Sequence, residues 1–242
     1  MKNVKKKSLI GIIIALIIVV SFGLPSYAFD EINNLINRIM YYEDYGSYEL
    51  DGIPDYSKYD YVILNENVPE FTEKEKNTKS YEFYSELDYL GRCGEVSANI
   101  STDLMPTEER GTIGQIKPSG WHTIKYDIID GKYLYNRCHL IGYQLTGENA
   151  NEKNLITCTR QMNTGAMLDI ENDIAEYIKE TNNHVLYRVT PVYEAENLLA
   201  KGVQIEAYSV EDNGKGIKLN VFIYNVQDGI KIDYKTGESE LE

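Results

Sequence analysis

The 242-residue sequence contains few cysteines and histidines, three of each. The cysteines, Cys93, Cys138 and Cys158, have no C-x-x-C spacing, and with so few histidines beside them the sequence argues against a structural zinc site. Apolar and aromatic residues are not scarce, at 43% and 11%, which excludes a wholly disordered, collagen-like or coiled-coil chain. The composition therefore favours one packed domain of ordinary size, or two small ones.

Positive charge is also scarce. The chain has 24 Lys and Arg against 38 Asp and Glu, a formal net charge of -14. Taken as a whole, such a charge argues against a polyanionic partner, because a protein that binds nucleic acid through phosphates normally presents an excess of Lys and Arg.

The first 28 residues are expected to be a secretory signal peptide. Four lysines, the last of them Lys7, precede a 16-residue apolar run from Leu9 to Leu24, and Ser26-Tyr27-Ala28 offers small residues for cleavage after Ala28. An uncleaved membrane anchor is the alternative, but the run is shorter than the ~20 residues that span a bilayer, which favours cleavage. We expect a secreted, extracellular protein, which stays at the cell surface if the signal is not cleaved and otherwise has no stable membrane insertion.

The rest of the chain reads as α+β. Three short strands are expected at residues 113–116, 133–141 and 155–159. Apolar residues at helical spacing between Ile170 and Ile178 predict an amphipathic helix. Alternating segments at 185–189 (ended by Pro191), 203–207 and 217–223 follow, and Asp228-Gly229 predicts a hairpin turn into residues 230–234. Strands, one helix and then an antiparallel sheet indicate the α+β class.

The negative charge is unevenly distributed along the chain. Residues 105–165 carry seven Lys or Arg against six Asp or Glu, whereas the segments on either side, 29–104 and 166–242, are strongly acidic. Such a window in an acidic protein could face an anionic ligand, although charge along a sequence is not charge on a surface. Within and just after it, a strand that carries His139 is followed by a loop, a second strand, and then Asn163 and Glu171 entering a helix.

This arrangement resembles the DNA/RNA non-specific endonucleases of the ββα-metal superfamily, in particular the secreted bacterial DNases and DNA-entry nucleases. The resemblance covers residues 51–238 and is carried by four blocks in order: 104–111 (LMPTEERG), 117–121 (KPSGW), 135–141 (YNRCHLI) and 154–163 (NLITCTRQMN). Asn136 and Cys138 stand where the family's histidine motif usually has Asp and Gly. The resemblance implies a signal peptide (1–28), a linker (29–50) and an endonuclease domain (51–242) with the ββα-metal fold.

The resemblance also implies a mechanism. His139, as a neutral imidazole, would take a proton from the water that attacks a phosphodiester. Mg²⁺, with Mn²⁺ as the alternative, would be bound by Asn163, while Glu171 holds its water ligands. Asn154 would support either the metal or the histidine loop. The expected catalytic group is His139, Arg110, Arg137 and Glu171, and the expected substrate-binding group is Arg110, Arg137, Arg160 and Lys117.

The sequence leaves several alternatives open. The substrate is DNA, with RNA as a second candidate, bound mainly through phosphates because no recognition helix, basic arm or aromatic platform is evident. The same fold could be an inactive nucleic-acid-binding module at the cell surface. The ten tyrosines between Tyr41 and Tyr89 could instead form a carbohydrate-binding face. His122 and His184 are interpreted as structural or surface residues. The cysteines could all be small buried residues, or one pair could be a disulfide, for which Cys93–Cys138 is the pairing to test.

Overall fold

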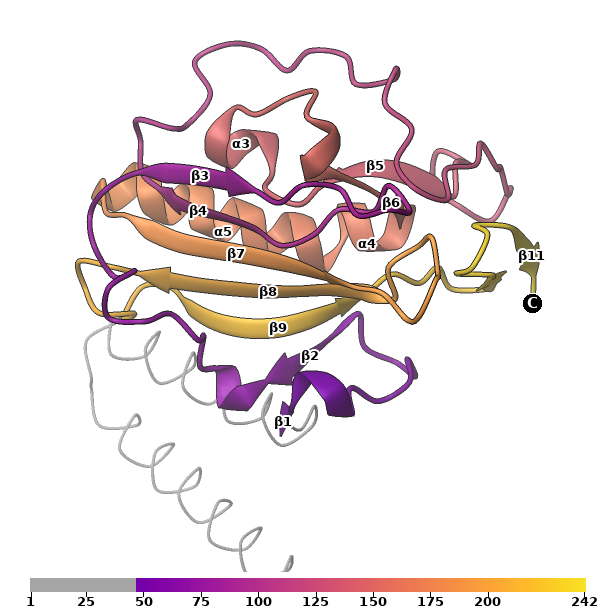
Figure 1. Ribbon diagram of the computed structural model, residues 1–242, viewed down its shortest axis with the longest axis horizontal. Coiled ribbons are helices and arrows are strands. Elements are labelled where there is room, and N and C mark those ends of the chain that lie inside the picture. Colours follow the sequence, from indigo (N-terminus) through magenta and orange to yellow (C-terminus); the bar gives the residue numbers. More distant parts are fainter. Residues whose placement is uncertain (1–46) are drawn as a thin grey trace, which may run out of the picture. The chain divides into compact units, whose positions relative to one another are not determined.

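A seven-stranded sheet forms the centre of the fold (Figure 1). The computed structural model describes residues 47–242; the expected signal peptide and nearly all of the expected linker lie outside this range. The strands lie in the order β1 (Ser47–Tyr48), β2 (Tyr61–Leu64), β9 (Lys218–Tyr224), β8 (Gly202–Ser209), β7 (Val185–Val192), β4 (Val96–Ile100) and β3 (Tyr81–Tyr84). Neighbouring strands are antiparallel except for the short β1–β2 pair.

Helix α5 (Ala166–Thr181) runs alongside the sheet (Figure 1), which confirms the helix expected from the apolar periodicity. Its buried residues follow one face: Met167, Glu171, Ile174, Ala175 and Ile178. Four of these five are apolar, as expected for a helix packed on a core. The fifth, Glu171, places a carboxyl group inside the buried stripe, and a charged group in that position needs a reason.

A separate two-stranded ribbon precedes α5. It pairs β5 (Tyr135–His139) with β6 (Leu155–Thr159) in an antiparallel register, and α4 (Arg160–Thr164) follows β6 directly. The loop between the strands carries the short helix α3 (Tyr143–Thr146) and the 3₁₀ turn η3 (Glu152–Asn154), while the 3₁₀ turns η1 (Leu50–Gly52) and η2 (Asn65–Asn67) lie earlier in the chain. Strand, strand and helix therefore occur in the order expected from the sequence.

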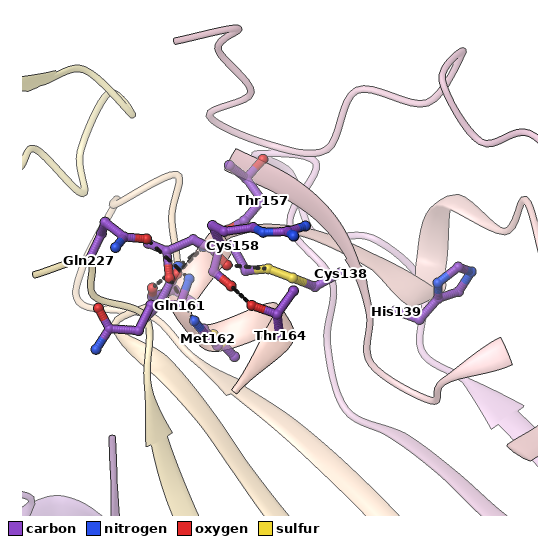
Figure 2. The surroundings of a disulfide bond; sticks show 12 residues. Cys138, His139, Thr157, Cys158, Gln161, Met162, Thr164 and Gln227 are labelled. Atoms are coloured by element: carbon purple, nitrogen blue, oxygen red, sulfur yellow. Dashed lines mark hydrogen bonds between the residues drawn. A yellow bond between two sulfur atoms is a disulfide. The ribbon is translucent and has the colours of Figure 1, made fainter. Parts of the chain in front are cut away.

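A disulfide joins the two strands of the ribbon (Figure 2). It links Cys138 to Cys158, whose Cα atoms are 5.9 Å apart, so the suggested Cys93–Cys138 pairing is wrong. In the strand register Cys138 faces Ile156 and Asn136 faces Cys158, which places the two cysteines diagonally across the ribbon. Cys93 is a buried free thiol, and burial raises the pKa of Cys93 to about 12.

Three further expectations about strands differ from the structure. Residues 113–116 form no strand; they belong to an irregular segment. Strand β7 continues through Pro191 and was not ended by it. Strand β4 pairs with β7 only as far as Val189, so the N–H that Pro191 lacks leaves no gap in the hydrogen bonds between β4 and β7. The chain does turn at Gly229, but β10 (Ile230–Ile232) pairs with the C-terminal β11 (Ser239–Leu241) and not with β9.

Together the antiparallel sheet, the ribbon and the helices confirm the α+β class. Strand β1, which lies before residue 51, pairs with β2 and so belongs to the same sheet. Within residues 47–242, no helix is long and apolar enough to cross a membrane.

Candidate active site

His139 is the last residue of β5, and the chain directly after it is held in place by Asn154. The Asn154 side chain accepts a hydrogen bond from the Ile141 backbone N–H (2.9 Å) and donates one to the Ile141 carbonyl (3.0 Å). Asn154 is completely buried, so its amide acts as a clamp on the histidine loop. Of the two roles expected for Asn154, this contact pattern fits support of the loop and gives no indication of metal binding.

The two ring nitrogens of His139 have different partners. Nε2 lies 2.7 Å from the Asn149 carbonyl oxygen, and Nδ1 lies 3.1 Å from a guanidinium nitrogen of Arg110. A carbonyl only accepts and a guanidinium only donates, so the neutral ring carries its proton on Nε2 and has its lone pair on Nδ1. His139 is 7% exposed, and burial, reinforced by the Arg110 charge, lowers the pKa of His139 to about 4.

Glu171 brings its carboxylate to the same region from α5. Oε2 accepts a hydrogen bond from the Gln144 side chain (2.9 Å), whereas Oε1 is buried without a hydrogen-bond partner among the described residues. Burial raises the pKa of Glu171 to about 8, against the opposing effects of Gln144, the Gly142 N–H and the Arg110 charge. A Cβ at position 142 would lie 2.5 Å from Oε2, so only glycine leaves room for this carboxylate.

A cavity of about 590 Å³ adjoins these residues. Arg110 and Asn163 both line it, and the same Arg110 side chain contacts His139 and influences the pKa of Glu171. Arg110 therefore connects the histidine, the buried carboxylate and the cavity with Asn163. These four residues were selected from separate positions in the sequence, and the fold brings His139 and Glu171 to Arg110 and places Asn163 in the same cavity lining as Arg110.

The other predicted cationic residues differ in their surroundings. Arg137 lines the cavity, but its guanidinium donates to the carbonyls of Gly114 (2.9 Å) and Ile116 and lies 3.9 Å from the centre of the Trp121 ring. Arg160 also lines the cavity and pairs with Asp130 at 3.0 Å. Lys117 is exposed and is not part of the lining that the structure describes.

Three residues of this site were missed by sequence reasoning: Gln144, Asn149 and Gly142. Asn149 acts through its backbone carbonyl, which any residue would provide, so its identity carries no signal. Gln144 and Gly142 lie close to His139 in the sequence, yet their relevance depends on α5 bringing Glu171 beside them. The other histidines behave as expected: His122 Nε2 contacts the Thr236 carbonyl, and His184 pairs with Glu211.

The donor set around this site suits a hard divalent cation. Amide and carboxylate oxygens are ligands that Mg²⁺ accepts, and Mg²⁺ commonly keeps several of its waters. The unpartnered, buried Oε1 of Glu171 is the observation that fits such an ion, because a bound cation or its waters would supply the missing partner. Within residues 47–242, no group of three or more His, Cys, Asp or Glu side chains could hold a metal ion, so an ion here would rely on Asn163 and water.

Comparison with known proteins identifies the family of the chain. Residues 72–211, more than half of the chain, match the family model described as DNA/RNA non-specific endonuclease. The chain belongs to this family. A curated deoxyribonuclease from Streptococcus dysgalactiae subsp. equisimilis is 32% identical over 110 residues, which are 43% of this chain and 32% of that protein. The match thus spans about a third of that relative's length.

Solved structures of family-like nucleases share the fold. NucA from Streptococcus agalactiae with no metal bound is 25% identical with a TM-score of 0.69, over 80% of this chain and 92% of that chain. NucA with a magnesium ion bound is 26% identical with a TM-score of 0.62, over 69% and 80%. The Sda1 nuclease with a bound zinc ion is 29% identical with a TM-score of 0.60, over 76% and 96%. The chain therefore has the ββα-metal fold expected from its motifs.

Proposed function

We propose that this chain is a secreted, metal-dependent endonuclease that hydrolyses the phosphodiester bonds of DNA and accepts RNA as a second substrate. Membership of the family supports the nuclease activity. The observation that carries the mechanism is the pair of contacts on His139, which fixes the proton of a neutral imidazole on Nε2 and leaves the Nδ1 lone pair facing the Arg110 guanidinium. The inactive binding module stays the alternative.

His139 acts as the general base in this proposal. The Asn149 carbonyl holds the proton on Nε2, so the Nδ1 lone pair is the site that accepts a proton from the attacking water. The water oxygen bonds to phosphorus, the bond from phosphorus to the leaving oxygen breaks, and the water's proton moves to Nδ1. Because the pKa of His139 is lowered to about 4, the base is in its neutral form at neutral pH.

Arg110 binds the phosphate in this proposal. Its guanidinium donates to Nδ1 at 3.1 Å, which occupies the lone pair that the base must use. A phosphodiester is anionic and accepts two parallel hydrogen bonds from a guanidinium, so it competes for Arg110 with a neutral imidazole nitrogen. Binding of the substrate thus transfers Arg110 to the phosphate and frees Nδ1 for water.

The residues present fit a divalent cation. We assign Asn163 as the protein ligand and Glu171 as the acceptor for the cation's waters, with Gln144 and Gly142 orienting that carboxylate. When bound, the cation would supply positive charge to the phosphate and to the leaving oxygen, and the same charge would favour the ionised form of Glu171, whose pKa burial raises to about 8. Mg²⁺ is the proposed ion, with Mn²⁺ as the alternative; among the similar structures, one has magnesium bound and another has zinc.

Digestion of plasmid DNA and of RNA, with Mg²⁺ or with EDTA, tests this function. We expect metal-dependent cleavage by the wild type and a loss of roughly 10²–10⁴-fold in His139→Ala. His122→Ala is the matched control, because that histidine contacts the Thr236 carbonyl outside the site and its removal should leave cleavage unchanged. Absence of metal-dependent cleavage by the wild type would favour the inactive binding module.

A further inference from the structure

The cavity beside the site has features that hydrolysis of a phosphodiester alone does not require. It measures about 590 Å³, which is larger than a single phosphate needs. Arg110, Arg137 and Arg160 line it, and among the described residues no Asp or Glu does. In a chain with a net charge of -14, this is a local site for an anion.

Aromatic side chains form another part of the lining. Trp121 packs against a buried cluster that includes Leu134 and Tyr135, and the Arg137 guanidinium lies 3.9 Å from its ring centre. Tyr133 also lines the cavity and is 47% exposed, and the Lys125 ammonium lies 4.4 Å from its ring centre, so part of the ring is exposed to a ligand. Nucleobases stack on aromatic rings and on the flat face of a guanidinium, and these surfaces provide both.

The lining also retains unused hydrogen-bond donors. Asn136 Nδ2 and Arg160 Nε are buried and have no acceptor within the described residues. Both belong to side chains that line the cavity. A buried donor without an acceptor costs free energy, and the oxygens of a phosphate or a base carbonyl in the cavity would satisfy it.

We propose that this cavity binds one nucleotide of the substrate strand, next to the phosphate that is cut. The base lies against the Arg137 guanidinium beside Trp121 and against Tyr133, its phosphate is held by Arg160 and Asn136, and Arg110 binds the scissile phosphate. This inference rests on the proposed nuclease function and adds a contact to the base. A base in the cavity has left its stack, so unpaired strands bind more tightly than duplex.

Trp121 gives a direct readout, because it is the only tryptophan in the chain. The His139→Ala variant of the full chain in EDTA is titrated with thymidine 5′-monophosphate, deoxyribose 5-phosphate and inorganic phosphate while tryptophan fluorescence is recorded. We expect saturable quenching by the nucleotide, with an affinity at least about tenfold higher than that of the sugar phosphate, the fold-change of one stacking contact. Equal affinities for the nucleotide and inorganic phosphate would overturn the proposal.

Two variants in the same background separate this site from the surface. Tyr133→Ala should weaken nucleotide binding by about tenfold. Tyr89→Ala removes a tyrosine that is 80% exposed and lies outside the cavity lining, and it should leave binding unchanged. If both variants weaken binding equally, or if neither weakens it, the assignment of the base to this cavity is wrong.

The preference for unpaired strands is tested with single-stranded and duplex oligonucleotides of the same sequence. We expect tighter binding of the single strand, and equal binding of the two would contradict the proposal.

Failure of this inference differs from failure of the nuclease function. Cleavage by the wild type without nucleotide quenching would refute the cavity alone, whereas quenching without cleavage would refute the nuclease function alone.

Discussion

The pH dependence of cleavage follows from the surroundings of His139. The side chain is 7% exposed, and burial together with the Arg110 charge lowers its pKa from 6.5 to about 4. A general base works only in its neutral form, so the acid limb of the pH profile should lie near this lowered pKa. At about pH 5.5, a histidine with the ordinary pKa is about 9% neutral, whereas one with a pKa of about 4 is about 97% neutral. The difference in rate is therefore about tenfold.

The assay is kcat/KM for a short DNA substrate, measured at saturating Mg²⁺ between neutral pH and about pH 4. We expect nearly full activity at about pH 5.5 and a steep loss as the pH approaches the lowered pKa. NMR measures the same pKa without catalysis: the histidine ring signal that is absent from the spectrum of His139→Ala belongs to His139, and its shift is followed as the pH is changed. An acid limb near the ordinary pKa in both measurements would refute the claim that burial sets the protonation state of this base.

The same shift affects stability. Because the pKa of His139 is lower in the folded state than in the unfolded state, the unfolded chain takes up its proton first as the pH falls. Above the unfolded-state pKa of about 6.5, the histidine is neutral in both states and the shift does not affect the free energy of unfolding. Between about pH 6.5 and about pH 4 the free energy of unfolding falls, by about 3 kcal/mol in total. His139→Ala should lack this component when urea unfolding is compared at the two ends of that range.

Three other changes have defined outcomes. Replacing Cys138 and Cys158 together by alanine opens a loop of 20 residues, and urea unfolding should show a loss of about 3 kcal/mol; the same midpoint as the oxidised wild type would contradict this. Gly142→Ala places a Cβ 2.5 Å from Glu171 Oε2, so it should lower the free energy of unfolding by about 1–3 kcal/mol and reduce cleavage. Gly52→Ala is the control, because the space around its Cβ is open and neither stability nor cleavage should change. Glu171→Gln should raise the Mg²⁺ concentration needed for half-maximal cleavage by about 10–100-fold, and an unchanged Mg²⁺ requirement would show that the carboxylate does not serve the ion.

Patterns within single segments predicted much of the fold. Helix α5 and strands β5 to β10 were expected because side-chain burial repeats every 3.6 residues in a helix and every second residue in a strand, whereas β1 to β4 and β11 were not expected. The helix expected around Ile170–Ile178 extends from Ala166 to Thr181. Errors arose where pairing depends on distant residues: Pro191 is accommodated because β4 has already ended, and β10 pairs with the C-terminal strand beyond it.

The site was predicted in part. Motif order led to His139, Asn163 and Glu171, and the structure adds the contact that Arg110 makes with Nδ1. The pairing of Cys138 with Cys158 could not be read from three cysteines, because the β5–β6 register decides which side chains meet. The aromatic lining of the cavity was also not predicted, because Trp121 and Tyr133 lie apart in the sequence and form no aromatic run.

The sequence by itself determined the α+β class, the family and the choice of candidate site residues, because these depend on local periodicity and on motifs contiguous in the chain. Only the tertiary structure decided the protonation state of His139, the burial of Glu171 and the aromatic cavity. A pKa depends on the solvent and charges around a group, and a cavity depends on side chains that come together from separate segments. The net charge of -14 argued against a polyanionic partner, whereas the fold places Arg110, Arg137 and Arg160 in the lining of one cavity.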